Sequence, residues 1–209
     1  ANLESRVHTM GMEDNIFNVI VPMEEEAEIK DGKMTGFDID IGLALCAEMK
    51  RECRFEQIDW EALIPALKTN KIDAIVASMN DTPERRESIS FTDPYYSNPG
   101  IFVRAKGSSI EPTPEGVKGK NVGVLRASIF DNYVTDKFPE ANIQRYTGQD
   151  EANQDALAGR VDLLFADKIV MEEGFLQRDE GKDFEQAGTD VDDKKYFGAG
   201  ISIGVRKDD

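Results

Sequence analysis

The sequence contains few of the residues that perform catalysis or bind metals. Histidine occurs once, at His8, and cysteine only twice, at Cys46 and Cys53. Two thiols and one imidazole are too few soft ligands for a structural zinc site. There is no glycine-rich phosphate loop, and no carboxylate pair stands apart as an acid–base couple. We therefore expect no enzyme, no metal site and no cofactor.

Long apolar runs and positive charge are also scarce. No run approaches the ~20 apolar residues of a membrane helix, so direct membrane insertion is not expected. The chain has 41 Asp and Glu against 25 Lys and Arg, a net charge of −16. That excess repels phosphate backbones and argues against nucleic acid as a partner. It weakly favours a cationic ligand, although a solvated acidic surface explains it as well.

The two cysteines lie where an apolar-periodic helix (Ile41, Leu45, Met49) gives way to a turn. A helix end followed by a turn could bring them together. A disulfide formed in an oxidising compartment and two buried free thiols both remain open. The start at Ala1 suits a mature chain after removal of a signal peptide.

Residues 66–77 and 156–166 are similar in sequence. Each copy predicts a helix end, a short turn and a wholly apolar strand, the kind of strand that is buried on both faces of a parallel sheet. Each half is therefore expected to hold its own small α/β sheet, although a chance match of this length is an alternative. Strands are also expected at 18–21, 101–104, 121–125 and 201–205, and helices at 39–49, 61–68, 129–137 and 168–176. Two loops rich in Pro, Gly and Ser, 93–100 and 107–119, place a lobe boundary near residue 103.

Ligands of open α/β sheets gather at the carboxyl ends of parallel strands. After the first apolar strand, Thr82 can cap a helix whose first position is Pro83. Arg85 then falls in the first turn, where a guanidinium can grip a carboxylate with two parallel hydrogen bonds. An exposed ion pair of Arg85 with Glu84 or Glu87 is the competing interpretation.

Three further side chains lie at strand ends or helix starts. Ser128, with Asp131 three residues on, resembles a helix cap whose free amides a carboxylate could share. Asp167 could accept hydrogen bonds from an ammonium group or cap the following helix. Trp60 begins an apolar stripe (Leu63, Ile64, Leu67) typical of a core. Pro65 requires the helix to start shortly before it, which leaves Trp60 free to stack on a ligand side chain or a cation.

Several segments carry a resemblance to a known family. They read GFDIDIG at 36–42, ALIPALK at 62–68, KIDAI at 71–75, GVL at 123–125, EGFL at 173–176 and KKYFG at 194–198, together with the two cysteines. From about residue 34 to its end, the chain resembles the type II periplasmic binding proteins of polar amino-acid ABC transporters. The closest branch binds lysine, arginine, ornithine and histidine. The resemblance implies that Cys46 and Cys53 form a disulfide.

The fold implied is α/β with two lobes, each a small, mostly parallel sheet flanked by helices. Hinge strands would join lobe 1, residues 1–102 and 199–209, to lobe 2, residues 103–198. The C-terminal helices that complete the first lobe in this family are absent from this chain.

The resemblance also implies roles for single residues. Arg85 would bind the ligand α-carboxylate with help from Ser128 and the region of Ser78, and Asp167 would bind the α-ammonium group. The remaining expected site residues are Trp60 against the ligand side chain, Asn80 and Asp38 lining the site, and Glu13 or Asp14 facing a cationic side chain.

Three positions depart from the family pattern. Ile129 stands where a threonine hydroxyl assists the carboxylate, Ala127 where a glycine lets the backbone approach, and Ala77 where a serine is common. We expect carboxylate binding to be weakened or altered. The first 33 residues match the family pattern poorly, and we expect an insertion around residues 19–27.

The function implied is reversible binding of an L-amino acid with a basic side chain (Arg, Lys, ornithine or His) in the interlobe cleft. A monomer would deliver this ligand transiently to a membrane ABC permease, either in the periplasm or outside the cell on an anchor beyond this chain. One alternative is a cyclohexadienyl or arogenate dehydratase on the same fold. Another is a sensor or a degenerate domain without transport function.

Overall fold

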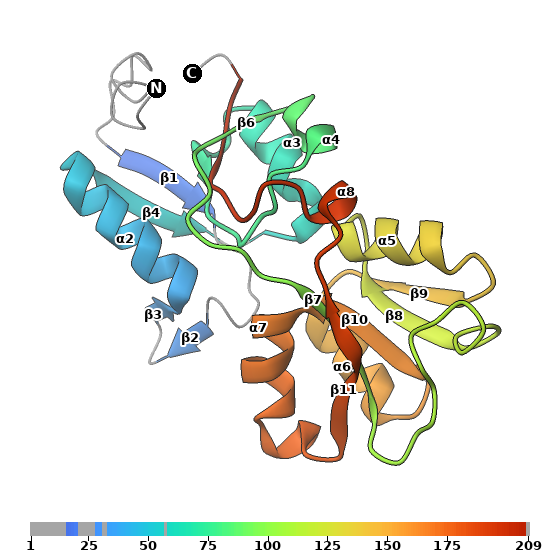
Figure 1. Cartoon of the computed structure of the whole chain (residues 1–209). Coiled ribbons are helices and arrows are strands. Elements are labelled where there is room, and N and C mark those ends of the chain that lie inside the picture. The colour runs from blue at the N-terminus through green and yellow to red at the C-terminus, as the bar shows by residue number, and fades with distance from the viewer. Residues whose placement is uncertain (1–15, 21–27, 31–32, 57, 208–209) are drawn as a thin grey trace. The chain divides into compact units, whose positions relative to one another are not determined.

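The computed structural model of this chain describes residues 16–20, 28–30, 33–56 and 58–207. Internal contacts divide the chain into two compact units, residues 1–97 with 198–209 and residues 98–197. Each unit contains its own five-stranded sheet (Figure 1). The expected lobe limits, residues 1–102 with 199–209 for lobe 1 and 103–198 for lobe 2, stay a prediction.

The sheet of the first unit has the strand order β4-β1-β5-β12-β6. Its strands are β4 (Glu52–Glu56), β1 (Ile16–Ile20), β5 (Ala74–Ile75), β12 (Gly204–Val205) and β6 (Ser90–Phe91). β1 pairs in parallel with β4 and β5, whereas β12 runs antiparallel to β5 and β6. A hairpin of β2 (Glu28–Lys30) and β3 (Lys33–Thr35) belongs to the same unit.

Apolar side chains cover both faces of this sheet because the buried strand residues point alternately to either side. Ile39 and Cys46 of α2 (Phe37–Met49) pack with Val76 on one face. On the other face, Leu63 and Leu67 of α3 (Leu63–Lys68) pack with Ile75 and Met79. A 3-10 turn, η1 (Trp60–Ala62), leads into α3, so the helix starts shortly before Pro65 as expected.

Cys46, near the end of α2, forms a disulfide with Cys53 of β4. Between them, Lys50 adopts a left-handed conformation with φ 54° and ends the helix. The turn that the spacing suggested therefore brings the two thiols together, and the disulfide implied by the family resemblance is confirmed.

The sheet of the second unit has the order β11-β7-β10-β8-β9. Its strands are β11 (Phe184–Val191), β7 (Gly100–Ala105), β10 (Leu163–Asp167), β8 (Asn121–Leu125) and β9 (Asn142–Tyr146). β8 pairs in parallel with β10 and β9, and β7 pairs antiparallel with β10 and β11. The apolar runs of the sequence thus occupy the middle of the sheet.

Helices cover both faces of the second sheet (Figure 1). α5 (Ile129–Lys137) and α8 (Lys194–Phe197) lie over an aromatic core in which Phe102 and Phe165 stack with ring centroids 4.0 Å apart. α6 (Gln149–Leu157), α7 (Lys168–Met171) and a π-helical turn, η2 (Glu172–Leu176), supply residues to the core on the other side. None of the helices in the described ranges is both long and apolar enough to cross a membrane.

Most of the expected elements form. The strand at 121–125 and the helix at 129–137 have the predicted bounds, and 168–176 divides into α7 and η2. The strand expected at 201–205 is shorter, because Ile201 makes only single bridges to Asn80 and Tyr96. The sequence did not indicate β9 and β11, which are polar strands at the sheet edges without a continuous apolar run.

Candidate functional site

The loop after β5 carries Arg85 into α4 (Pro83–Arg86). Thr82 caps this helix by accepting a hydrogen bond of 3.3 Å from the Arg85 backbone N–H, and Pro83 occupies its first position. The capping predicted from the sequence is confirmed. A proline at this position loses no hydrogen bond, since the first helical N–H groups lack intrahelical partners.

The Arg85 side chain has two close contacts within the first unit. One guanidinium nitrogen donates a hydrogen bond of 2.9 Å to the backbone carbonyl of Asn80, and the guanidinium carbon lies 5.4 Å from the centroid of the Trp60 ring. Among the described residues, Arg85 forms no ion pair, so the expected alternative of a salt bridge with Glu84 or Glu87 is not observed. Burial lowers the pKa of Arg85 to about 10, and the nearby Glu84 charge acts in the opposite direction. Arg85 therefore remains a cation at neutral pH.

Asp38 and Ser78 form the second polar group of the first unit. Asp38 is completely buried in α2 and accepts hydrogen bonds from the hydroxyls of Ser78, at 3.0 Å, and Tyr95, at 3.1 Å. The Ser78 hydroxyl also shares a short hydrogen bond with the hydroxyl of Tyr96. Burial raises the pKa of Asp38 to about 6, while the bonds from Ser78 and Tyr95 lower it. A buried carboxylate thus fixes a serine that the sequence placed in the site.

Ser78 is held in an unusual backbone conformation, with φ 44°. Only a few per cent of residues other than glycine adopt positive φ, and such strain persists where surrounding contacts enforce it. Asp38, Tyr95 and Tyr96 supply those contacts. The two tyrosines were not singled out from the sequence, where they lay in a loop used only to place a boundary. Their adjacency to Pro94 is the only local signal, and it does not reveal a partner far away in sequence.

Residues 199–202 hold the loop between Ser78 and Arg85 by backbone hydrogen bonds. Asp81 donates a backbone hydrogen bond of 2.8 Å to Gly200 and accepts one of 3.0 Å from Ala199. Ser202 donates another, of 3.0 Å, to the carbonyl of Met79. Asn80 is buried, and its carbonyl is the acceptor for Arg85. The loop that carries the expected site residues is consequently tied to a segment more than a hundred residues away.

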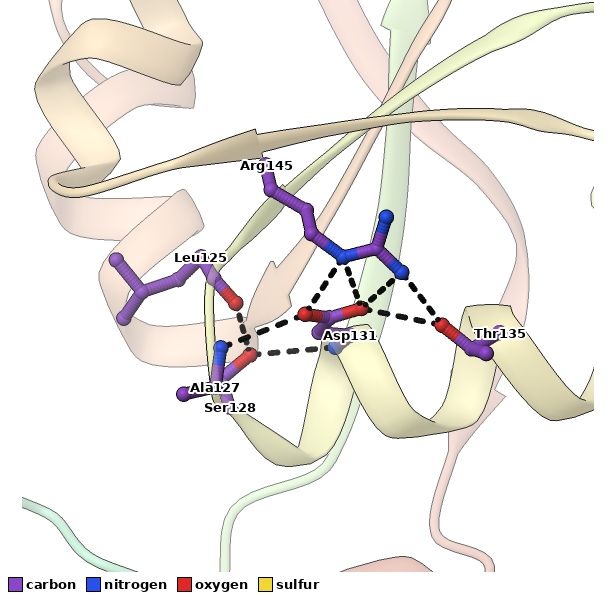
Figure 2. Close-up of polar contacts among 6 residues, drawn as sticks. All are labelled: Leu125, Ala127, Ser128, Asp131, Thr135 and Arg145. Carbon is purple, nitrogen blue, oxygen red and sulfur yellow. Dashed lines mark hydrogen bonds and ion pairs between the residues drawn. The ribbon is translucent and has the colours of Figure 1, made fainter. Parts of the chain in front are cut away.

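In the second unit, Ser128 caps α5 (Figure 2). Its hydroxyl donates a hydrogen bond of 2.6 Å to the carbonyl of Leu125 and accepts one of 3.2 Å from the backbone N–H of Asp131. The predicted cap is therefore present. The single hydroxyl proton is already used, so Ser128 would act on a ligand through its backbone amide or after a change of hydrogen-bond partner.

The Asp131 carboxylate holds the turn before α5 together. It accepts bonds from the Ala127 N–H at 3.4 Å, from Thr135 at 3.1 Å and from the Arg145 guanidinium at 2.9 and 3.0 Å (Figure 2). Ala127 itself is left-handed, with φ 57°. This is a conformation that glycine adopts readily and alanine does not, in keeping with the glycine that the family resemblance implies at this position.

Ile129, at the position where the family resemblance implies a threonine, is buried in the aromatic core of the second unit. Its side chain contains no hydrogen-bonding atom. The departure noted from the sequence therefore removes a hydroxyl at the start of α5 and adds apolar packing.

Asp167 lies at the end of β10 and caps α7. One carboxylate oxygen accepts bonds from the backbone N–H groups of Ile169, at 3.0 Å, and Val170, at 3.3 Å, and a further bond from the Asn98 amide. The cap predicted as an alternative role is thus formed. Because β8 and β10 are parallel neighbours, Ser128 and Asp167 follow the same edge of the second sheet.

The structure gathers the expected site residues into groups within each unit. Arg85, Trp60 and Asn80 are together in the first unit, beside the separate pair of Ser78 and Asp38. Glu13 and Asp14 lie outside the described residues, and their predicted role stays a prediction. No group of three or more His, Cys, Asp or Glu suited to a metal ion occurs within the part of the chain that the structure describes.

Comparison with known proteins assigns the family. Residues 20–209 match the model of the bacterial extracellular solute-binding proteins, family 3. The chain belongs to this family.

Individual relatives agree with that assignment. The L-arginine-binding protein of Pseudomonas aeruginosa is 46% identical over 181 residues, covering 86% of this chain and 70% of the relative. The lysine/arginine/ornithine-binding periplasmic protein of Escherichia coli is 43% identical over 180 residues, covering 85% of this chain and 69% of the relative. A solved periplasmic binding protein of Salmonella typhimurium with high arginine specificity has a TM-score of 0.85 at 30% identity, covering 93% of this chain and 86% of its own. The α/β fold with two sheets expected from the sequence is therefore confirmed.

Proposed function

We propose that this protein reversibly binds an L-amino acid with a cationic side chain and delivers it to a membrane ABC permease. The observation that carries the proposal is the half-buried Arg85 guanidinium, which pairs with no carboxylate among the described residues. A buried cation without a protein counter-ion is costly unless a ligand anion or water satisfies it. The arginine- and lysine-binding relatives indicate the class of ligand.

The roles of the two ends of the ligand follow from charge. Arg85 binds the α-carboxylate, because a planar guanidinium can donate two parallel hydrogen bonds to it. Asp167 binds the α-ammonium group while its other interactions continue to cap α7. Ser78, Asn80 and Ser128 support these contacts, and Glu13 or Asp14 faces the cationic side chain.

Arg85 has a larger share of carboxylate binding here than the family pattern implies. Ile129 provides no hydroxyl, and the Ser128 hydroxyl proton is bound to Leu125. The backbone amides at the start of α5 remain as donors in the second unit. Removal of Arg85 should accordingly leave little affinity.

The protein acts as a carrier and not as a catalyst. The named relatives are binding proteins, and those of Escherichia coli and Salmonella typhimurium are periplasmic by their names. We place this protein in the periplasm, or outside the cell on an anchor beyond this chain, as a monomer that meets its permease transiently.

Isothermal titration calorimetry with L-arginine, L-lysine, L-ornithine and L-histidine tests the proposal. Arg85→Ala should weaken binding of each by about 100-fold or more, since breaking a buried charge contact costs about 3–5 kcal/mol. Arg160→Ala, which removes an exposed arginine paired with Asp155, is the matched control. Unchanged affinity in Arg85→Ala would refute the carboxylate role, and absence of binding by the unaltered protein would refute the function. Turnover of prephenate or arogenate would instead support the dehydratase alternative.

A further inference from the structure

A buried asparagine, Asn98, contacts the carboxylate of Asp167. The two residues are only 5% and 9% exposed, and both belong to the second unit. The side-chain nitrogen of Asn98 donates a hydrogen bond to Oδ1 of Asp167. The sequence did not single out Asn98, which lies in the loop 93–100 that served only to place a lobe boundary. Asn98 is therefore a polar neighbour of the expected ammonium-binding residue.

The backbone around Asn98 is fixed against the start of α7. Pro99 follows Asn98, and a residue before proline is restricted to extended conformations. The Pro99 carbonyl accepts a hydrogen bond of 2.9 Å from the Lys168 N–H. Gly100, at the start of β7, is paired with Asp167 in the sheet. The segments on both sides of the contact thus hold Asn98 beside Asp167.

The contact fixes which end of the Asn98 amide faces Asp167. Oδ1 of Asp167 also accepts hydrogen bonds from the backbone N–H groups of Ile169 and Val170. An ionised carboxylate only accepts hydrogen bonds, so the amide presents its nitrogen to Asp167 and keeps its oxygen for another donor. The reversed amide would place two acceptors against each other. The Asn98 oxygen is accordingly an acceptor beside the carboxylate.

The amide oxygen of Asn98 has no donor within the described part of the protein. Among the described residues, the bond to Asp167 is the only hydrogen bond of the Asn98 side chain. A polar atom on so deeply buried a side chain is costly unless a ligand or an ordered water satisfies it. An ammonium group has three N–H donors and no acceptor. An amide oxygen next to a carboxylate therefore matches the chemistry of a primary ammonium group.

We infer that Asn98 is a further ligand-binding residue, whose amide oxygen accepts a hydrogen bond from the α-ammonium group that Asp167 binds. This inference rests on the proposed function and deepens it. Asn98 also has a second effect, because its amide nitrogen holds the Asp167 carboxylate in place. Asn98 therefore adds affinity only for ligands that carry an α-ammonium group, whatever their side chains.

Calorimetry with L-arginine and 5-guanidinopentanoate tests this inference. The second compound is arginine with hydrogen in place of the α-ammonium group, so it keeps the carboxylate and the cationic side chain. Asn98→Ala should weaken binding of L-arginine by about 10- to 100-fold, the effect of a hydrogen bond to a charged group. It should change binding of 5-guanidinopentanoate, measured by displacement with L-arginine, by less than about threefold. Asn142→Ala is the matched control, because it removes an exposed asparagine of the same unit that bonds to the Gly119 carbonyl.

A double-mutant cycle separates a direct contact from an effect through Asp167. Asp167→Asn removes the charge of this side chain but keeps its shape. If Asn98 contacts the ammonium group directly, Asn98→Ala in the Asp167→Asn background should weaken binding of L-arginine further, by about 5-fold or more. If Asn98 only held the Asp167 carboxylate, the second substitution would have no further effect, and the ligand contact would be refuted.

Asn98→Ala can also contradict the inference while the proposed function stands. Equal losses for both compounds would show a general distortion of the second unit and overturn the inference, as would unchanged binding of L-arginine. In either case the unaltered protein would still bind L-arginine. Absence of binding by the unaltered protein would instead refute the proposed function and the inference with it.

Discussion

The hydroxyl of Ser78 donates a hydrogen bond of 3.0 Å to the carboxylate of Asp38. Asp38 lies forty positions earlier in the sequence and has no exposed surface. The other carboxylate oxygen of Asp38 accepts a hydrogen bond from the hydroxyl of Tyr95. Two hydroxyl donors do not compensate for the loss of water around a buried charge, and the pKa of Asp38 is raised to about 6. The buried carboxylate therefore lowers stability when it is ionised while it orders Ser78.

The stability of the folded protein should depend on pH through Asp38. A raised native pKa means that the folded state binds more protons than the unfolded state between about pH 4 and pH 6. Stability should therefore fall across this interval as pH rises, by about 3 kcal/mol at most for a shift of two pKa units. Urea unfolding from pH 4 to 7.5 should show this slope in the unaltered protein but not in Asp38→Asn. A slope retained in Asp38→Asn would assign it to other groups.

Ser78→Ala provides an independent check on the same carboxylate. It removes the hydrogen bond that most lowers the pKa of Asp38, so the downward slope should extend to higher pH. An unchanged slope in this variant would show that the Ser78 bond does not stabilise the ionised form.

Ala127→Gly should stabilise the protein. Ala127 is exposed and has φ 57°, so glycine relieves backbone strain without losing packing. The greater freedom of glycine in the unfolded chain offsets part of the gain, which leaves about 0.5–1 kcal/mol. Ala158→Gly is the matched control, because Ala158 is also exposed but has φ −81° and should become less stable. Equal effects of the two substitutions would show that the left-handed conformation is not the cause.

Arg145→Ala should destabilise the turn before α5. It removes the guanidinium that bonds to both oxygens of Asp131, whose side chain is only 11% exposed. The loss should be about 1–3 kcal/mol in the free energy of urea unfolding. Arg160→Ala, at a more exposed pair with Asp155, should have a smaller effect. A double-mutant cycle of Arg145→Ala with Asp131→Asn should show coupling, and additive effects would contradict it.

Removal of the disulfide should destabilise the first unit. Cys46 and Cys53 are seven positions apart, and closing so short a loop restricts the unfolded chain by about 2.5 kcal/mol. Reductant should therefore lower the midpoint of urea unfolding, followed by Trp60 fluorescence. The variant with both Cys46→Ala and Cys53→Ala should start lower and be insensitive to reductant. An identical midpoint in reduced and oxidised protein would mean that the bond does not contribute.

The sequence by itself determined the local structure. Thr82 and Pro83 start α4, Ser128 and Asp131 start α5, and the apolar runs at Ala74 and Leu163 become inner strands. Helix caps depend on hydrogen bonds between residues three or fewer positions apart, and wholly apolar strands depend on composition. Both properties can be read from a few neighbouring residues. The family resemblance added the disulfide, which the spacing of the cysteines had left open.

Tertiary structure alone decided which partners the site residues have. The Trp60 ring contacts the Arg85 guanidinium, and Asp38 accepts a hydrogen bond from Ser78. Ile201 forms a β-bridge with Asn80. Tyr95 reaches Asp38 across 57 positions, and Arg145 reaches Asp131 from an edge strand that the sequence did not indicate. These contacts join elements whose adjacency follows from the strand order of each sheet and the helices packed on it. No local pattern contains that order, because it is set by the burial of apolar faces over the whole unit.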